Sequence, residues 1–370
     1  MYILLDTLYV WYIKNVKKVY MDYGATTPID ETVLRAMLPY LSEDFGNASS
    51  LHTWGRDASK AVERARAQVA KLIGAKAEEI YFTSGATEAN KLVLSIPCKV
   101  KVASRIEHPS ILSSGVELEL LEVDEFGRIR LELLEAELKR GADFVSVGLV
   151  NSEIGTVQDI EAIGKLCRKH GAILHTDATQ GVGKMKIDVD AMGVDALTMS
   201  GHKIFGPKGV GVLFVSNRLK WKPPGGGTFN VPAIVGMGAA TQLEVDVEYI
   251  RELRDYLIER IQAEIPHAYL NGHPKHRVCN NVNISFKAVE GEAILISLDQ
   301  VGVAVSTGSA CASGSTEPSY VLAALGVQNA GANSIRFTLS HHNTKDEIDY
   351  VVSNLKPIIE KLRAMSPLGV

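Results

Sequence analysis

The sequence predicts an α/β protein in which helices cover both faces of a mostly parallel sheet, with a smaller α+β domain after it. Three observations support this prediction. Between residues 57 and 215, short apolar strands alternate with amphipathic helices, and parallel strands need such crossover connections. After Pro223–Gly227 the pattern changes to longer helical stretches with fewer strands. The length of 370 residues fits two domains at about 150 residues each.

The first part of the chain contains the elements of the expected parallel sheet. The stretch 57–73 places Ala58, Val62 and Val69 on one apolar face, which predicts an amphipathic helix. A second helix is expected over residues 160–170. Strands are expected at 79–83, 99–104, 143–150, 172–175, 196–200 and 210–215.

The second part of the chain is expected to be α+β. Helical residues run over 232–265, and an amphipathic helix over 345–365 closes the chain. Further expected elements are strands at 281–286, 304–307 and 335–339, and a helix near 292–301. Together these patterns predict a large domain over residues 31–243. We expect residues 1–30 and 244–370 to form the small domain.

Charge and hydropathy exclude several classes of partner. Lys and Arg number 39 against 43 Asp and Glu, giving a net charge of −4, so nucleic acid is a poor candidate partner. The apolar stretch 1–13 is interrupted by Asp6 and is shorter than the roughly 20 residues that span a bilayer. Its lysines follow the apolar run, unlike those of a secretory signal. We therefore expect no membrane association, and we interpret the N-terminal stretch as an additional packed segment or the result of an early start codon.

The four cysteines are far apart in the sequence, at positions 98, 167, 279 and 311. Because no CxxC pair is present, a structural zinc site is not expected. A disulfide framework would be unusual in a long chain with a large apolar content. These features predict a reduced, cytoplasmic protein in which a single cysteine could serve as a nucleophile.

The segment Thr83–Glu88 follows a predicted strand and precedes a helical stretch. A helix N-terminus presents unpaired N–H groups and a partial positive charge, and Gly85 would let the backbone approach an anion closely. This arrangement is compatible with a phosphate site, to which the hydroxyls of Ser84 and Thr87 would add donors, but taken alone it does not establish one. The alternative is an ordinary serine N-cap followed by a glycine turn.

Two further polar groups follow predicted strands. Asp177 ends the strand that contains His175, and Lys203 follows the strand that ends at Ser200. Ligands of open parallel sheets bind at the carboxyl ends of the strands, so both side chains are placed where a cofactor could be held. Asp177 could instead cap the next helix, and Lys203 could be an ordinary surface lysine.

These segments together meet the demands of pyridoxal 5′-phosphate. This cofactor needs a lysine that bonds to its aldehyde carbon, an anion beside its pyridine nitrogen and a cradle for its phosphate. Lys203, Asp177 and the Gly85–Thr87 turn supply one group for each demand. The joint match is far more specific than any one of the three motifs.

A loop rich in small residues, Val305–Gly314, carries Cys311. A thiol becomes nucleophilic when it is exposed and deprotonated, and the Gly and Ser residues around Cys311 favour exposure over burial. A buried, inert cysteine is the alternative. Arg336 lies inside a short predicted strand, where a planar guanidinium could bind a substrate carboxylate or form a structural ion pair.

With these motifs in their order along the chain, the sequence resembles the cysteine desulfurases of the NifS/IscS type. These enzymes belong to the class V aminotransferase group of pyridoxal-phosphate enzymes with fold type I. The resemblance extends from Val19 to Met365. It rests on DYGATTP, FGNASSLH, FTSGATEAN, HTDATQ, SGHKIFGPKGVG, VSTGSACASG and SIRFTLS.

The resemblance implies a large cofactor-binding domain with a seven-stranded sheet, a small domain that carries the Cys311 loop, and a homodimer. It implies that Lys203 bonds to the cofactor, that His108 stacks on its ring and assists proton transfer, and that Cys311 is the nucleophile. The remaining cofactor contacts are assigned to Ala86, Thr87, Asp177, Gln180, Ser200, His202 and Thr228, the last reaching the phosphate of the partner subunit. The substrate carboxylate is assigned to Arg336, helped by Asn151 and Ser152.

The implied reaction converts L-cysteine to L-alanine and leaves a persulfide on Cys311 for an acceptor such as an iron–sulfur scaffold protein. Cys311 could also act as a transient iron–sulfur ligand; no other metal site is expected. A selenocysteine lyase, a class V aminotransferase and a weakly active partner-binding scaffold are the alternatives. The chain departs from the family at Ser152, where asparagine is usual, and in a shorter segment around residues 225–230.

Overall fold

The structure is a computed structural model, and it describes residues 17–307, 319–327 and 333–366. The expected packed segment at residues 1–13 and the predicted nucleophile Cys311 both lie outside these ranges. Within them, none of the helices combines the length and the apolar character that a membrane span requires.

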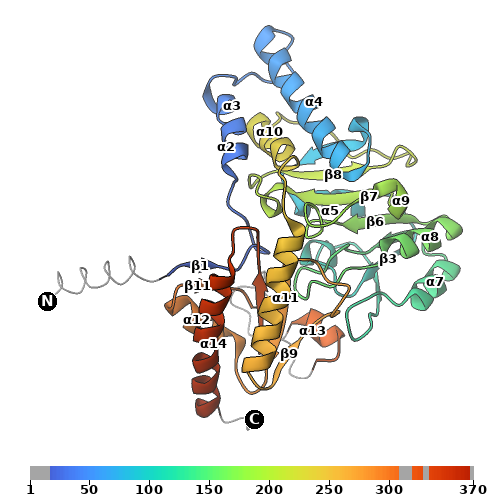
Figure 1. Cartoon of the computed structure of the whole chain (residues 1–370). Coiled ribbons are helices and arrows are strands. Elements are labelled where there is room, and N and C mark those ends of the chain that lie inside the picture. The colour runs from blue at the N-terminus through green and yellow to red at the C-terminus, as the bar shows by residue number, and fades with distance from the viewer. Residues whose placement is uncertain (1–16, 308–318, 328–332, 367–370) are drawn as a thin grey trace. The chain divides into compact units, whose positions relative to one another are not determined.

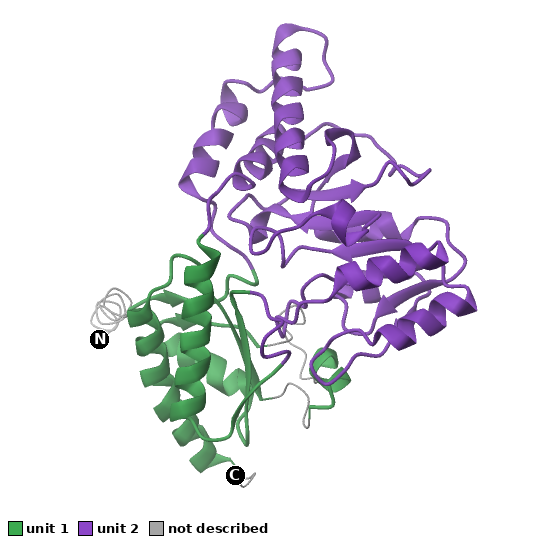
Figure 2. Cartoon of the chain, turned by 45° about the vertical axis from the view of Figure 1, so that its right-hand side comes forward, with its two compact units in different colours: residues 1–25, 246–271, 279–370 green, residues 26–245, 272–278 purple. Residues whose placement is uncertain are grey.

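The chain forms two compact units (Figure 2). The larger contains residues 26–245 and 272–278, and the smaller contains residues 1–25, 246–271 and 279–370. The sequence had placed residues 26–30 in the small domain. They belong to the larger unit because Thr27 N donates to the His202 carbonyl at 2.9 Å and Asp30 N to the Phe205 carbonyl at 3.0 Å.

The short segment 272–278 was also expected in the small domain, and it too belongs to the larger unit. Arg277 Nη1 donates to the Ile154 carbonyl at 2.7 Å, and Val278 N donates to the Gly155 carbonyl at 3.0 Å. These long-range bonds connect it to a turn more than 100 residues earlier, which no local pattern in the sequence could indicate.

The larger unit contains a seven-stranded sheet with the order β2-β8-β7-β6-β5-β3-β4. Only β8 runs antiparallel to its neighbours β2 and β7; the other pairs are parallel. The predicted mostly parallel sheet is therefore confirmed, and the carboxyl ends of all strands except β8 lie at one edge. The strands are β2 Ile80–Thr83, β3 Lys101–Ser104, β4 Glu119–Leu121, β5 Phe144–Ser146, β6 Ile173–Asp177, β7 Ala196–Ser200 and β8 Gly211–Val215.

Helices accompany this sheet in the same unit (Figure 1). Helix α8 occupies Ile160–His170, as expected, because the Asp159 side chain accepts from Ala162 N at its start and Gly171 ends it with a φ of 73°. The other helices of the unit are α2 Glu31–Met37, α3 Pro39–Ser42, α4 Thr53–Ile73, η1 Ala77–Glu79, α5 Ala86–Leu94, α6 Pro109–Leu112, α7 Leu131–Arg140, α9 Val189–Met192, η2 Gly201–Lys203 and α10 Val231–Ala240.

The expected helical stretch 232–265 is two helices, α10 and α11 (Val247–Glu264), which belong to different units. Helix α10 ends at Thr241, whose hydroxyl donates to the Gly238 carbonyl at 2.6 Å. A new start follows at Asp246, whose side chain accepts from Tyr249 N at 2.9 Å. Threonine and aspartate both bind nearby backbone groups, so they terminate and restart helices.

The smaller unit contains the antiparallel sheet β12-β10-β9 and the two-stranded parallel sheet β1-β11. Along β10 and β12 the side chains alternate between an apolar set, such as Val282 and Phe337, and a polar set that includes Asn283 and Arg336. Its strands are β1 Val19–Tyr20, β9 Ala268–Leu270, β10 Asn281–Phe286, β11 Val303–Ala304 and β12 Ser334–Thr338. With α11, its helices are α12 Gly291–Gln300, α13 Tyr320–Ala324 and α14 Lys345–Met365.

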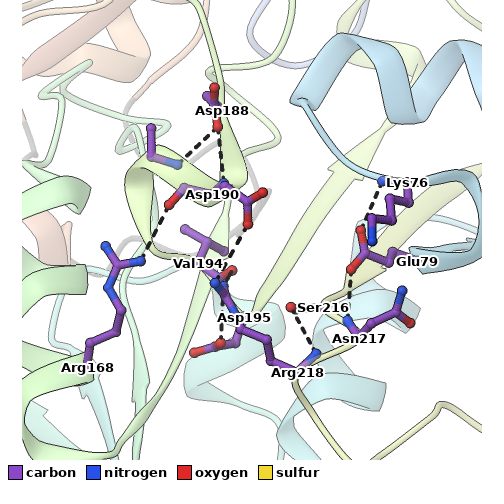
Figure 3. Close-up of polar contacts among 11 residues, drawn as sticks. Lys76, Glu79, Arg168, Asp188, Asp190, Val194, Asp195, Ser216, Asn217 and Arg218 are labelled. Carbon is purple, nitrogen blue, oxygen red and sulfur yellow. Dashed lines mark hydrogen bonds and ion pairs between the residues drawn. The ribbon is translucent and has the colours of Figure 1, made fainter.

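At the amino ends of β2 and β7, a cluster of polar side chains fixes the connections (Figure 3). The Glu79 carboxylate accepts from Lys76 N at 2.9 Å and from Asn217 N at 2.8 Å. Arg218 donates to the Val194 carbonyl at 3.0 Å and lies 3.5 Å from the Asp195 carboxylate. This cluster lies at the edge opposite to the carboxyl ends, so we regard it as structural.

Candidate active site

The carboxyl-terminal edge of the large sheet brings together most of the predicted cofactor residues. Asp177 is the last residue of β6, and Ser200 is the last residue of the neighbouring β7. The 3-10 turn η2 starts directly after Ser200 and ends at Lys203, while β2 leads into Gly85 and α5 at the same edge. The spacing of 26 residues between Asp177 and Lys203 is thus a parallel crossover between adjacent strands.

The start of α5 has the properties expected of a phosphate site. Among the residues that the structure describes, no side chain caps this helix, so the N–H groups of Ala86 and Thr87 in its first turn have no capping acceptor there. A Cβ on Gly85 would meet no heavy atom within 4 Å, which shows open space beside the backbone. The hydroxyl and N–H of Ser84 instead bind Glu88, at 2.7 and 2.6 Å, so Ser84 is not the cap that the alternative required.

Lys203 lies on a short 3-10 turn that is tied to the start of the larger unit. The carbonyl oxygen of the preceding residue, His202, accepts a hydrogen bond from the Thr27 hydroxyl. The ring atom Nδ1 of His202 lies 3.2 Å from the Thr26 hydroxyl. Burial, together with the charges of Lys203 and Lys208, lowers the pKa of His202 to about 4. His202 is therefore a neutral hydrogen-bonding group near pH 7.

The backbone two residues after Lys203 is strained. Phe205 has a φ of 62°, a region that bulky residues rarely adopt and that costs about 1–3 kcal/mol. Its N–H donates to the Thr27 hydroxyl at 2.9 Å, and its carbonyl accepts from Asp30 N at 3.0 Å. Contacts with residues far away in the sequence thus fix the peptide that positions the lysine.

The Asp177 carboxylate is held by two donors. Oδ1 accepts from Thr179 N at 2.9 Å, and Oδ2 accepts from the buried Asn90 Nδ2 at 2.8 Å. The first bond closes a turn, and no helix starts there, so Asp177 is not the helix cap of the alternative interpretation; the second bond orients the other oxygen. Thr179 Oγ1 is buried and has no hydrogen-bond partner in the described part of the chain, so a bound group could use it.

His175 is fully buried on β6 and links three strands. Its Nδ1 is 2.9 Å from Ser146 Oγ on β5, and its Nε2 is 3.1 Å from Thr198 Oγ1 on β7. Burial lowers its pKa to about 4, against the opposing influence of Asp177. His175 is therefore a neutral cross-link under the Asp177 end of β6.

Glu107 and His108 follow β3 at the same edge. Glu107 is 4% exposed, and its Oε1 accepts from Gly148 N at 2.8 Å. Burial raises the pKa of Glu107 to about 8, and the nearby charge of Asp177 adds to this rise. His108 begins α6 and accepts at Nδ1 from Ser110 N at 3.1 Å.

Asn151 holds the turn that follows β5. Its Oδ1 accepts from Glu153 N at 2.9 Å and Ile154 N at 3.0 Å, and its Nδ2 donates to the Ile106 carbonyl at 2.9 Å. The side chain therefore stabilises this turn and ties it to the segment before Glu107. Ser152, the second residue of the predicted pair, is half-buried on the same turn.

Arg336 lies on β12 of the smaller unit, with its side chain 6% exposed. Its Nη2 is 2.9 Å from Oδ1 of Asp22, so it forms the structural ion pair that was one of the two predicted alternatives. Its backbone exchanges hydrogen bonds with Ser306, at 2.7 and 3.1 Å. The Arg336 guanidinium can bind a carboxylate ligand while it remains paired with Asp22, or it can exchange Asp22 for that ligand.

The remaining predicted residues are placed as follows. Gln180 is half-buried on the turn after Asp177, three residues along from it. Thr228 is exposed between β8 and α10 and is not brought to the edge by any contact of the described chain. In the described ranges no group of three His, Cys, Asp or Glu side chains could hold a metal ion.

Comparison with known proteins identifies the family. Residues 19–226 and 224–351 match the model described as Aminotransferase class-V. The chain is 43% identical to "Cysteine desulfurase IscS" of Dictyoglomus turgidum, over 95% of this chain and 97% of that protein. It is 41% identical to "Cysteine desulfurase IscS 1" of Archaeoglobus fulgidus, over 94% and 99%. The chain belongs to the class-V aminotransferase family.

Solved structures agree with this assignment. The NifS-like protein from Rickettsia africae superposes with a TM-score of 0.85 at 31% identity, covering 93% of this chain and all of that one. A structure titled "SspA in complex with cysteine" has a TM-score of 0.77 at 31% identity, covering 88% of this chain. The resemblance inferred from the motifs is confirmed, and pyridoxal 5′-phosphate is the cofactor of this family.

The residues of the larger unit fit this cofactor. Uncapped N–H groups with open space beside Gly85 suit its phosphate, and an oriented carboxylate at Asp177 suits its pyridine nitrogen. Lys203 follows the adjacent strand, where its amine can reach the same edge. The sequence alone had not identified Asn90, Glu107, Ser110 or Asp22 as supporting residues. The available signals were that Asp22 and Asn90 lie inside quoted motifs and that Glu107 and Ser110 lie within two residues of His108.

Proposed function

We propose that this chain is a cysteine desulfurase that converts L-cysteine to L-alanine and carries the removed sulfur as a persulfide on Cys311. The observation that supports it best is the grouping of Lys203, Asp177 and the α5 N-terminus at one sheet edge. The curated relatives named cysteine desulfurase, at 41–44% identity over almost the whole chain, point to the same activity.

The bound cofactor supplies an electron-withdrawing ring that takes up the electron pair left when the substrate loses its α-proton. Asp177, oriented by Asn90 and Thr179, would keep the pyridine nitrogen protonated. The N–H groups of Ala86 and Thr87, with Ser200 and His202, would hold the phosphate. Gln180 would bind the ring hydroxyl, and His108 would lie against the ring.

Substrate recognition would be shared between two segments. Arg336 would bind the substrate carboxylate, because a guanidinium can present two parallel N–H donors to the two carboxylate oxygens. Asn151 would act mainly by fixing the turn that carries Ser152, because its own side chain binds that turn. The Lys203 amine, once displaced by the substrate amine, would accept the α-proton.

The sulfur step would use the thiol of Cys311. Its thiolate attacks the substrate Sγ, so that an S–S bond forms while the bond between Sγ and Cβ breaks. The electron pair of the broken bond remains with the carbon fragment, which gains protons and leaves as alanine. The persulfide would then pass to an acceptor, for which an iron–sulfur scaffold protein is the first candidate.

The experiment compares three proteins. The wild type should absorb visible light through its covalently bound cofactor and release alanine from cysteine. Lys203→Ala should lose this absorbance, while Cys311→Ser should keep it and form no persulfide. Cys98→Ser, a partly buried thiol elsewhere in the larger unit, is the matched control. Normal sulfide release by Cys311→Ser would refute the assignment, and a faster reaction with selenocysteine would favour a selenocysteine lyase.

The functional form would be a cytoplasmic homodimer. Within the larger unit, a run of exposed apolar side chains occupies α2, α3 and the segment leading to α4. Exposed apolar groups this dense favour a protein partner, and a second copy of the chain would cover them symmetrically. They are Ile29, Leu34, Leu38, Leu41, Phe45, Leu51 and Trp54. Thr228 would reach the partner's phosphate in such a dimer.

A further inference from the structure

A continuous chain of hydrogen bonds connects Asp177 to His108 within the larger unit. Asn90 Nδ2 lies 2.8 Å from Asp177 Oδ2 and 2.9 Å from Ser110 Oγ. Ser110 Oγ in turn lies 2.8 Å from His108 Nδ1. Three elements, β6, α5 and α6, therefore contribute to a single polar path between the two groups proposed to contact the cofactor ring.

The chemistry of the groups fixes the direction of each bond. A carboxylate only accepts, so the Asn90 amide must present its NH₂ group to Asp177. The second amide hydrogen is then directed to Ser110 Oγ, which accepts it. The Ser110 hydroxyl keeps its own hydrogen, and the acceptor within reach is His108 Nδ1.

The burial of Asn90 supports this amide orientation. Asn90 is fully buried, and its Oδ1 has no partner in the described ranges. The reverse orientation would place Oδ1 against the Asp177 carboxylate, where two acceptors repel each other. The protein therefore tolerates one unpaired oxygen in order to keep both donors of this amide engaged.

The start of α6 adds a second donor to the same ring nitrogen. His108 is the N-cap of this helix, and its Nδ1 accepts from Ser110 N at 3.1 Å. Nδ1 thus faces both the backbone N–H and the hydroxyl of Ser110. A proton on Nδ1 would point at these two hydrogen-bond donors and would be repelled by them. A neutral imidazole must then carry its proton on Nε2.

We propose that Asn90 and Ser110 are positioning residues that hold His108 as the neutral Nε2–H tautomer. His108 then meets the bound substrate as a hydrogen-bond donor through Nε2 and does not accept the α-proton in the resting state. That proton goes to the Lys203 amine. The inference deepens the proposed function, since it rests on His108 lying against the cofactor ring, but the tautomer itself can be measured without turnover.

The Asp177 carboxylate, reached through Asn90, acts in the opposite direction because its negative charge favours a positively charged ring. Glu107 adjoins His108 in the sequence, but burial raises its pKa to about 8 and leaves it uncharged at lower pH. Glu88 and Lys91 on the packed helix α5 are exposed. The two donors of Ser110 at Nδ1 are the groups that favour the neutral ring.

The test is ¹⁵N NMR of histidine-labelled protein with its cofactor and without cysteine. The wild type should show His108 with an Nε2–H proton and an acceptor-type Nδ1. Ser110→Ala removes the hydroxyl donor and should raise the ratio of protonated to neutral His108, at fixed pH, by about fivefold. Ser110→Thr, which keeps a hydroxyl, should restore it, and Ser113→Ala, exposed just beyond α6, is the control.

Two results would overturn the proposal. One is a wild-type spectrum with the proton on Nδ1. The other is an unchanged titration of His108 in both Ser110→Ala and Asn90→Ala. If instead the wild type holds no cofactor or releases no alanine from cysteine, the proposed function fails while the tautomer result still stands.

Discussion

The buried carboxyl of Glu107 makes the stability of the protein depend on pH in a way that one substitution can isolate. Burial raises its pKa from an ordinary value of 4.5 to about 8, so the folded state binds a proton that the unfolded state releases between these values. Folding is then most favoured by this group below pH 4.5. That contribution is lost as the pH rises to about 8.

The size of the effect follows from the difference between the pKa of Glu107 in the unfolded and in the folded state. These pKa values differ by about 3.5 units, and each unit corresponds to 1.36 kcal/mol, which gives about 5 kcal/mol of stability in total. Glu107→Gln keeps an acceptor for Gly148 N and cannot ionise. Relative to the wild type, the variant should therefore gain stability between pH 5 and 8, by about 1.4 kcal/mol per unit.

The assay is urea unfolding of both holoproteins at pH 5, 6, 7 and 8, read as the difference in unfolding free energy. Glu119→Gln, at an exposed position on β4, is the matched control. A difference between Glu107→Gln and wild type that stays constant over this range would refute the reasoning. So would a wild type that becomes more stable than the variant as the pH rises.

Three further predictions concern contacts described above. Asp22→Ala leaves the nearly buried Arg336 without this carboxylate and should lower the unfolding free energy by about 3 kcal/mol; the double variant with Arg336→Met should lose less, measured by urea unfolding. Leu38→Asp should raise the dimer dissociation constant about tenfold or more in light scattering, whereas Ile296→Asp, equally exposed on α12, should not. Asn151→Ala removes the side-chain bonds that hold the turn carrying Ser152, so the KM for cysteine should rise several-fold; an unchanged KM would contradict this role.

Local signals predicted those elements whose ends the sequence itself marks. Helix α8 has Asp159 at its start and Gly171 at its end, and α14 begins with a capping box of Thr344 and Glu347. Helix α4 begins four residues before the predicted start because His52, an unusual capping residue, accepts from Gly55 N. Strong apolar periodicity identifies such helices but does not fix their first turn.

The supporting part of the site depends on contacts that no local pattern encodes. Asn90 binds a residue 87 positions away, and Asp22 binds one 314 positions away. The residue types at Lys203, Asp177 and Gly85 were informative because the cofactor demands them. Asn90 and Ser110 carry no such demand, and only the arrangement of α5, α6 and β6 reveals their connection.

The pairing of Ser306 with Arg336 limits where the sulfur can be delivered. Cys311 follows Ser306 by five residues, and a fully extended chain advances at most about 3.6 Å per residue, so its Cα stays within about 18 Å of a strand-anchored point. Under the proposed function, a recipient of the sulfur would therefore have to bring its acceptor group close to the surface around Ser306. Recipients that differ in their affinity for this protein should accordingly differ in their contacts with side chains near Ser306.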